Sequence, residues 1–220
     1  MEALLATVAP RVVVNVTSDG VDWAITADGS IRMATAKLGI RLVHVSSDAV
    51  FSGIGKTRYD ETCAPVPITP YGAAKAADET SVLLLCPDGV ADHTSLIIGD
   101  GGYHRERVVH ELAANEREGV LFTDGIRCPV HAADLAAGLW KLAASTETGV
   151  FHLAGTDALS RYSLSVLSAR RDGIAPSLLP VGRRADTRLL GALDVRLGSH
   201  ATQHRLGIRL RGAREFLDMR

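Results

Sequence analysis

Short apolar runs alternate with amphipathic segments along most of the chain. Runs rich in β-branched residues and bounded by glycine or polar residues predict buried strands. They lie at residues 11–17, 41–47, 90–99 and 149–155, and residues 120–130 read as a further strand running into a loop. Apolar residues at helical spacing lie at residues 21–39, 105–119, 131–145 and 160–173, and in a helix that begins near residue 70. Strands alternating with helices predict an α/β fold with a parallel sheet.

Local signals refine this outline. Thr69 followed by Pro70 is typical of a helix start, because threonine caps the free N–H groups and proline fits the first helical position. From Ile174 onward the sequence is rich in loop-forming residues and basic, which predicts a small C-terminal lobe or a tail packed on the sheet. Trp23 and Trp140 lie in helical patterns and are expected to be packing residues.

The composition is that of an ordinary globular protein. The 220 residues are 46% hydrophobic and 22% charged, with a formal net charge of -1. This balance lacks the basic excess of proteins that bind nucleic acid through its phosphates. No apolar run reaches the roughly 18 residues of a membrane span, and the start MEALLATVAPR lacks the features of a signal peptide. We therefore expect a cytoplasmic protein that contacts neither nucleic acid nor membrane.

Cysteine and histidine usage gives no metal signal. Cys63, Cys86 and Cys128 are odd in number and widely separated, so we expect reduced thiols rather than disulfides or a zinc site. His200 and His204 are four residues apart and could share a metal, but no third ligand is evident in the sequence. A solvated helix is the expectation there, and no metal site is predicted.

One pair of residues has the pattern of a proton-transfer site. The segment TPYGAAKAADE places Tyr71 and Lys75 four residues apart in a predicted helix. Residues at this spacing share a helix face, so the ammonium group lies near the phenol. A nearby cation favours phenolate and lowers a pKa that is ordinarily about 10, which makes the phenol usable as an acid or base. Taken alone the pattern is common, and its alternative is a solvated helix face.

A hydroxyl group occupies a suitable position beside this pair. The predicted strand at residues 41–47 ends in Ser46 and Ser47, followed by Asp48. Open α/β sheets bind their ligands at the carboxyl ends of strands. A serine there could therefore bind the same substrate oxygen that Tyr71 protonates.

These stretches resemble the extended short-chain dehydrogenase/reductase superfamily, most closely the dTDP-4-dehydrorhamnose reductase group of sugar-nucleotide-binding proteins. The matching segments are VHVSSDAVFSG, YDET, PITPYGAAKAADE, LFTDGIRCPVHAADLAAGL and GVFHLAG, in the family's order and through about Gly155. The resemblance implies a catalytic triad of Ser47, Tyr71 and Lys75. It also implies substrate contacts at Asp48, Ala49, Ser95 and Arg127, and nicotinamide contacts at Tyr71, Lys75 and Thr94.

The sequence departs from that family pattern in several places. Ala49 stands where the family has tyrosine, and His93 stands where many members have arginine. In the stretch from Ile25 to Gly29, Thr26 stands where relatives carry an asparagine at the active-site end of the helix. The residues Asp124, Arg127, His131 and Asp134 surround an RCPVH turn; we expect a structural ion pair that anchors the small lobe, with direct substrate contact as the alternative.

The largest departure concerns the cofactor. Family members begin with a strand, a glycine-rich turn and a helix that holds the pyrophosphate of NAD(P). This glycine motif is absent, and the first predicted strand resembles the family's fourth. The resemblance therefore implies an incomplete Rossmann-like sheet that lacks the first three strands, about one third of the expected domain. The glycine-containing stretches GDGGYH and SGIGKT do not have the required spacing and are expected to be loops.

Three functions remain open on this basis. The first is a reductase that protonates a ketone oxygen during hydride transfer from NAD(P)H, on a small molecule such as a nucleotide-linked keto sugar. The second is a cofactor-independent biosynthetic enzyme, a cyclase, dehydratase or isomerase, that uses the same triad for proton transfer alone. The third is a non-catalytic binding subunit. Retention of Ser47, Tyr71 and Lys75 favours an enzyme.

The order of the predicted strands and helices also suggests where the domains begin and end, and that two copies of the chain associate. Residues 1–155 are expected to form the truncated Rossmann-like domain, with part of the substrate lobe within residues 100–131. Residues 156–220 are expected to complete the substrate lobe. Without earlier strands, residues 11–17 would form a sheet edge with unpaired backbone groups. We expect a homodimer in which a second copy covers this edge.

Overall fold

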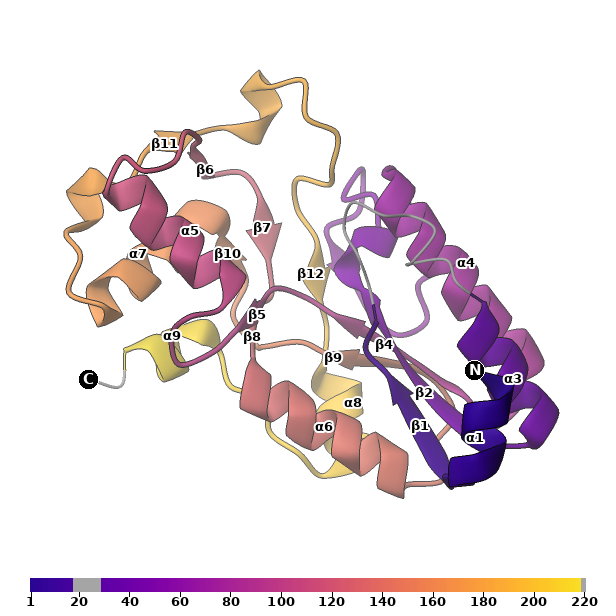
Figure 1. Ribbon diagram of the computed structural model, residues 1–220. Coiled ribbons are helices and arrows are strands. Elements are labelled where there is room, and N and C mark those ends of the chain that lie inside the picture. The colour runs from indigo at the N-terminus through magenta and orange to yellow at the C-terminus, as the bar shows by residue number, and fades with distance from the viewer. Residues whose placement is uncertain (18–28, 219–220) are drawn as a thin grey trace.

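The computed structural model describes residues 1–17 and 29–218, and four parallel strands form its central sheet (Figure 1). Their order is β1-β2-β4-β9, with every neighbouring pair parallel. Their bounds are β1 Val12–Asn15, β2 Arg41–Ser47, β4 Val90–Thr94 and β9 Gly149–Leu153. The predicted α/β class is confirmed, and each of these strands lies inside a run of apolar and β-branched residues. The predicted strand at residues 90–99 divides, because β4 ends at Thr94 and β5 (Ile97–Ile98) pairs elsewhere.

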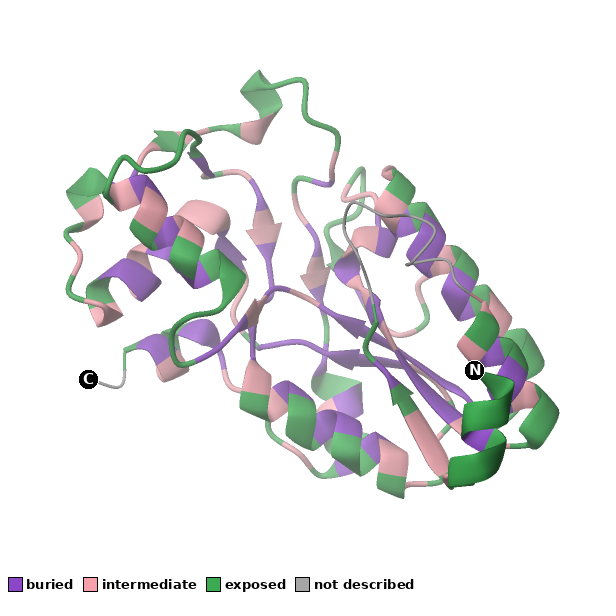
Figure 2. Ribbon diagram, viewed as in Figure 1, coloured by how far each residue is buried: buried purple, intermediate pink, exposed green. Residues whose placement is uncertain are grey.

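Helices cover both faces of this sheet. Helices α3 (Ser30–Leu38) and α4 (Pro70–Leu85) pack on one face, and α6 (Ala132–Ala144) and α8 (His200–Leu206) pack on the other. Figure 2 shows that α4 and α6 bury one side and expose the other. The main core lies between the sheet and α6, where Val43, Phe151 and Leu142 are fully buried. Helix α1 (Glu2–Val8) packs on α3.

A second group of elements lies beyond the carboxyl ends of the strands, where α5, α7 and α9 gather (Figure 1). Their bounds are α5 His104–Ala113, α7 Arg161–Arg171 and α9 Ala213–Leu217. Two-residue strands form four further pairs: β5 with β8 (Val130–His131), β6 (Leu121–Phe122) with β11 (Val181–Gly182), β7 (Ile126–Arg127) with β10 (Leu159–Ser160), and β3 (Arg58–Tyr59) with β12 (Arg196–Leu197). Short turns of 3-10 helix complete the chain: η1 Asp48–Val50, η2 Pro176–Leu178 and η3 Arg184–Asp186.

The first strand lies at one edge of the sheet. Among the described residues, β1 pairs only with β2. Val14 and Val16 are 37% and 64% exposed. Within the described residues, no strand lies beside β1 on the side away from β2.

Some expectations about helices were wrong or lie outside the described residues. Trp140 is 73% exposed on α6, so it is not a packing residue. The reason is position: it falls on the face of α6 that points away from the sheet, whereas Leu139 and Leu142 point inward. Trp23 and Thr26 lie outside the described residues. Helix α5 ends at Ala113 instead of continuing to residue 119, and Asn115 beyond it has a left-handed backbone with φ of 57°.

Candidate active site

A cavity of about 520 Å³ opens at the carboxyl ends of β2 and β4. It is lined by strand ends, the start of α4 and side chains from α5, β7 and α7. All eight residues singled out from the sequence line it: Ser47, Asp48, Ala49, Tyr71, Lys75, Thr94, Ser95 and Arg127. The structure thus brings together residues that are up to 80 positions apart in the chain.

Helix α4 delivers the tyrosine and the lysine to this cavity. The Thr69 hydroxyl accepts a hydrogen bond from the N–H of Gly72, which caps the helix as the sequence predicts. Gly72 lies directly against the turn that follows β2, because a Cβ atom there would overlap the carbonyl oxygen of Ala49. This close approach sets Tyr71 beside the end of β2.

Lys75 is buried beneath the cavity with only 1% of its surface exposed. Its Nζ donates to the carbonyl oxygens of Val45 at 3.0 Å and Thr17 at 3.4 Å. An ammonium group has three N–H donors, so one remains for a ligand. Burial lowers the pKa of Lys75, while the carboxylates of Asp78 and Glu79 oppose that shift.

The turn after β2 is fixed by side-chain hydrogen bonds. The Ser47 hydroxyl accepts from the N–H of Ala49 at 3.2 Å, which leaves its own proton free to donate into the cavity. Asp48 is buried, and its Oδ2 accepts from the Ser95 hydroxyl at 2.7 Å and lies 3.4 Å from Nε of Arg127. Asp48, Ser95 and Arg127 therefore hold one another at the wall of the cavity.

Arg127 is firmly anchored, but not by the predicted cluster. Its guanidinium donates to the carbonyl oxygens of Ile126, Ala192 and Leu193, besides the contact with Asp48. The other members of the predicted cluster have separate partners: Asp124 accepts from the backbone of Arg184 and Ala185, His131 contacts Asp100, and Asp134 pairs with Arg211. The four residues therefore do not form one ion-pair cluster in the structure.

Two further arginines reach the cavity, and the sequence analysis missed both. Within residues 1–17 and 29–218, neither the Arg105 nor the Arg161 side chain has a hydrogen-bond or ion-pair partner. Burial, together with the neighbouring charges of Arg105 and Arg127, lowers the pKa of Arg161 to about 9. Arg105 is exposed and Arg161 is half-buried, and like charges that line one cavity repel each other, so the arrangement fits an anionic ligand.

A second cavity of about 530 Å³ adjoins the first and shares Leu96, Arg105 and Arg161 with it. Its walls are largely apolar side chains of α5, β6 and α7: Val108, Val109, Leu112, Leu121, Phe122 and Leu164. The guanidinium of Arg184 lies 5.5 Å from the centre of the Phe122 ring and lines this cavity too. We call this cavity the apolar chamber. The two arginines thus separate a polar, hydroxyl-bearing space from an apolar one.

A buried polar chain runs under the sheet end beside Lys75. Ser46 donates to Glu79, which lies 3.0 Å from Nε2 of His93, and Nδ1 of His93 lies 2.9 Å from Nε2 of His152. Burial, followed by the charge of His93, lowers the pKa of His152 to about 3. A histidine with so low a pKa is neutral near neutral pH.

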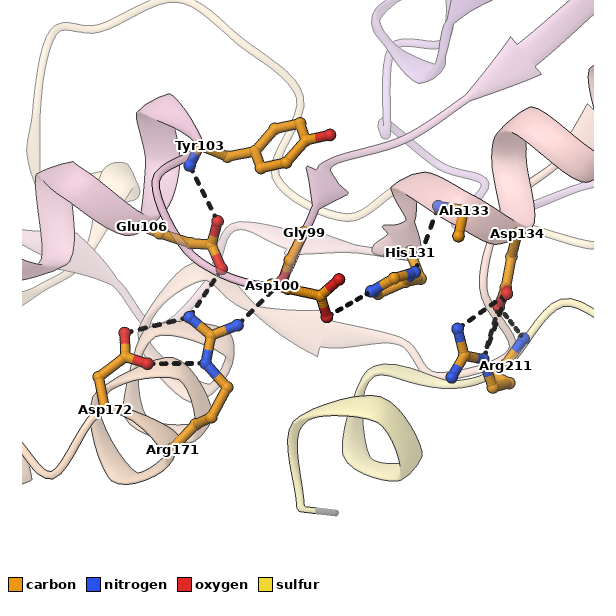
Figure 3. A network of polar contacts seen from close by, with 10 residues as sticks. All are labelled: Gly99, Asp100, Tyr103, Glu106, His131, Ala133, Asp134, Arg171, Asp172 and Arg211. Carbon is orange, nitrogen blue, oxygen red and sulfur yellow. Dashed lines mark hydrogen bonds and ion pairs between the residues drawn. The ribbon is translucent and has the colours of Figure 1, made fainter. Parts of the chain in front are cut away.

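The two loops that contain GDGGYH and SGIGKT lie in different surroundings. The loop at Gly99 is tied to the lobe because Arg171 donates to the Gly99 carbonyl and pairs with Glu106 at 2.7 Å, as Figure 3 shows. Glu106 also accepts from the N–H of Tyr103, so the start of α5 already faces a carboxylate. The loop at Gly53 leads into β3 instead of a helix. Tyr71 and Lys75, two of the residues expected at a nicotinamide, line the cavity, whereas the hydroxyl of the third, Thr94, donates to the Leu153 carbonyl.

Other candidate features are simple surface elements. His200 and His204 lie exposed on α8. No cluster of three potential metal ligands occurs in the residues that the structure describes. Within those residues, every helix is too short or too polar to cross a bilayer.

Comparisons with known proteins agree with this architecture. Residues 18–215 match the family model described as the RmlD substrate binding domain. The chain is 28% identical over 185 residues to the spore coat polysaccharide biosynthesis protein SpsK of Bacillus subtilis (strain 168), covering 84% of this chain and 65% of that protein. It is 32% identical over 154 residues to a dTDP-4-dehydrorhamnose reductase of Mycobacterium tuberculosis, covering 66% of this chain and 51% of that one.

Solved structures show the same fold. A dTDP-4-dehydrorhamnose reductase of Bacillus anthracis in complex with NADP superimposes with a TM-score of 0.85 at 22% identity, covering 99% of this chain and 82% of that one. A dTDP-glucose 4,6-dehydratase of the same organism, in complex with NAD, superimposes with a TM-score of 0.81 at 17% identity, covering 99% of this chain and 74% of that one. The chain therefore spans between about half and two thirds of the length of the curated relatives named above.

Proposed function

The chain belongs to the RmlD substrate binding domain family, and from that premise we propose that it is a reductase of a nucleotide-linked keto sugar. Relatives named dTDP-4-dehydrorhamnose reductase support this reaction class. The single observation that carries the proposal is the cavity lined by Ser47, Tyr71 and Lys75 at the carboxyl ends of the strands. Hydroxyl, phenol and ammonium groups are the set needed to bind and protonate a ketone oxygen.

Each of the three residues has a distinct proposed task. Ser47 donates its free hydroxyl proton to the ketone oxygen and fixes its position. Tyr71 transfers its phenolic proton to that oxygen as the adjacent carbon gains hydride, so the ketone becomes a secondary alcohol. Lys75 is anchored on two carbonyl oxygens and stabilises the phenolate that remains. A reduced nicotinamide, when bound, supplies the hydride.

The arginines support a phosphate-bearing substrate. In this proposal Arg161, where the two cavities meet, and Arg184 of the apolar chamber bind the diphosphate, and the apolar chamber receives the nucleoside. The sugar then projects toward Tyr71 through the space beside Arg105. In the proposal Ala49, Ser95 and Arg127 shape the wall around the sugar, and Asp48 holds that wall in place.

A second candidate function rests on the cofactor fit. Tyr71, Lys75 and Thr94 line the cavity, whereas the loop at Gly53 leads into a strand and the helix that follows the loop at Gly99 has the Glu106 carboxylate at its start. This observation favours an enzyme that uses the same cavity for proton transfer without NAD(P), such as a dehydratase or isomerase. The cavity and its proposed proton donor are the same in both functions.

The edge of the sheet supports a homodimer as part of the proposal. Val14 and Val16 are exposed beside the side of β1 that has no neighbouring strand among the described residues. Pairing of β1 with the same strand of a second copy would satisfy that backbone and bury both valines. A molecular mass of a monomer, measured by light scattering at micromolar concentration, would exclude the proposed homodimer.

A cofactor titration followed by a turnover assay tests the proposed reaction. NADH and NADPH are titrated into the purified chain by calorimetry, and dTDP-4-dehydrorhamnose is then added to detect nicotinamide oxidation. We expect cofactor binding and turnover that is abolished in Tyr71→Phe while the thermal unfolding temperature stays unchanged. Absence of binding at millimolar cofactor would exclude the reductase and leave the proton-transfer enzyme, and retained turnover in Tyr71→Phe would remove Tyr71 from the mechanism.

A further inference from the structure

Residues 183–191 form a largely exposed segment beside the apolar chamber, which we call the strap. Arg184, Thr187 and Leu189 of the strap line that chamber. The segment that contains β6 and β7 fixes the chain on either side of the strap. Before the strap, β11 pairs with β6, and after it the carbonyl oxygen of Leu193 accepts from the N–H of Ile126 at 2.7 Å.

Asp124 holds the strap between these two attachments. Its Oδ1 accepts from the N–H of Arg184 at 2.7 Å, and its Oδ2 accepts from the N–H of Ala185 at 2.9 Å. Among the described residues, these are the only hydrogen bonds between the strap and the rest of the chain. A carboxylate that accepts from two successive N–H groups fixes both the position and the orientation of that stretch of backbone.

The backbone that Asp124 fixes carries the arginine of the chamber wall. The guanidinium of Arg184 lies 5.5 Å from the centre of the Phe122 ring, and its Nη2 donates to the carbonyl oxygen of Leu190. It also lies against Gly191, where a Cβ atom would come within 2.4 Å of it. Its Nε is buried and has no hydrogen-bond partner among the described residues. A guanidinium has five N–H donors, so most remain for an anion.

A contribution to the core does not explain the contact between Asp124 and the strap. None of the side chains of residues 183–191 is buried, and those of residues 185–190 are all exposed. Fixing such a segment removes little apolar surface from water. The placement of Arg184 is therefore the main effect of the two hydrogen bonds.

We propose that Asp124 is a positioning residue for an anion site beside the apolar chamber, because it holds the strap where the guanidinium of Arg184 can bind a phosphate group. Asp124 itself touches no ligand in this scheme. The inference deepens the proposed function and rests on it, since there Arg184 binds the diphosphate of the substrate. Loss of the Asp124 carboxylate should weaken phosphate binding only through Arg184.

The affinity for dTDP, measured by calorimetry, tests whether Asp124 acts through Arg184. We expect Asp124→Ala and Arg184→Met each to weaken dTDP binding about 10-fold, as for the loss of a charge-assisted hydrogen bond. The double variant should bind no more weakly than Arg184→Met, because Asp124 has no effect once the guanidinium is gone. Asp124→Asn keeps one acceptor oxygen and should lose only about 3-fold.

Trypsin cleavage tests the strap itself without any ligand. Arg183, Arg184 and Arg188 are the cleavage sites within the strap, and mass spectrometry identifies the fragments. Release of the strap raises the population of the open segment, so Asp124→Ala should be cleaved at these sites about 10-fold faster than the wild type.

Asp157→Ala is the matched control. Asp157 also accepts a backbone N–H, from Arg214 at 2.8 Å, but it lines neither cavity. Its replacement should change neither the affinity for dTDP nor the cleavage of the strap, and effects equal to those of Asp124→Ala would overturn the inference.

Three further outcomes would overturn the inference: equal cleavage of the wild type and Asp124→Ala, unchanged affinity in either single variant, or additive losses in the double variant. A wild type that binds no dTDP would contradict the proposed substrate instead. The cleavage rates would then still decide whether Asp124 fixes the strap, so the two failures are distinguishable.

Discussion

Replacement of Gly72 by alanine tests how closely the start of α4 must approach the turn after β2. The new Cβ would overlap the carbonyl oxygen of Ala49 and lie 3.1 Å from Cβ of Pro67. Since the nearest group is backbone and not a flexible side chain, the helix and the turn must separate by roughly 1 Å. Overpacking of this kind costs about 1–3 kcal/mol, against which the higher helix propensity of alanine returns about 1 kcal/mol.

Two measurements follow this change. Urea denaturation should show a net loss of up to about 2 kcal/mol in the free energy of unfolding, after the propensity gain is subtracted. Turnover should fall by about 10²-fold, because a shift of 1 Å misplaces Tyr71 relative to Ser47. Gly125→Ala is the matched control, since its Cβ would meet only ordinary contacts at 3.6 Å. Gly72→Ala with wild-type stability and turnover would refute the reasoning.

Three further predictions concern charge and pH. Burial lowers the pKa of His44 and His152 to about 3, so both stay neutral in the folded state, and stability should fall as the pH drops from about 6.5 toward 3. His152→Gln should reduce this slope by about 1.4 kcal/mol per pH unit, measured by urea denaturation across that range; an unchanged slope would contradict the shift. Arg161→Met removes an unpaired cation and should weaken dTDP binding about 10–100-fold by calorimetry without lowering the thermal unfolding temperature; unchanged affinity would place the anion elsewhere. Asp48→Ala leaves Arg127 without its carboxylate and should cost about 3 kcal/mol in the free energy of unfolding, and a cost below 1 kcal/mol would show that the carbonyl partners suffice.

The sheet and the predicted site residues follow from local patterns. The runs VVVN and RLVHVSS are fully recognisable as strands because buried parallel strands are continuously apolar or β-branched. Once the strands are parallel, their carboxyl ends meet at one edge of the sheet. That rule places Ser47 and Thr94 near each other, and the cap at Thr69 aligns α4 with the same edge.

The arginines could not be found in this way. Arg105 and Arg161 belong to α5 and α7, which lie in the second group of elements and meet the cavity only through tertiary packing. The strands that position them are two residues long, too short to carry any periodic signal. One sequence signal could have drawn attention to these arginines. Each lies at the start of its helix, where the helix dipole disfavours a cation, so another reason for its presence could have been sought.

The buried polar residues of β2 also could not be predicted from the sequence pattern. His44 and Ser46 alternate with Val43 and Val45, which would ordinarily predict a solvated face. In the structure this face is covered by α4, whose Asp78 and Glu79 lie close to His44 and Ser46. Sequence periodicity cannot reveal that both sides of such an interface are polar.

Transfer of deuterium from a labelled nicotinamide to the product tests the central claim most directly. Reduced NAD(P) carrying deuterium at the transferring carbon is incubated with the protein and dTDP-4-dehydrorhamnose, and the product is analysed by mass spectrometry. The account predicts a dTDP-linked alcohol with one deuterium in the wild type and no such product in Tyr71→Phe. Conversion of the keto sugar to an unlabelled product by the wild type would contradict the reductase.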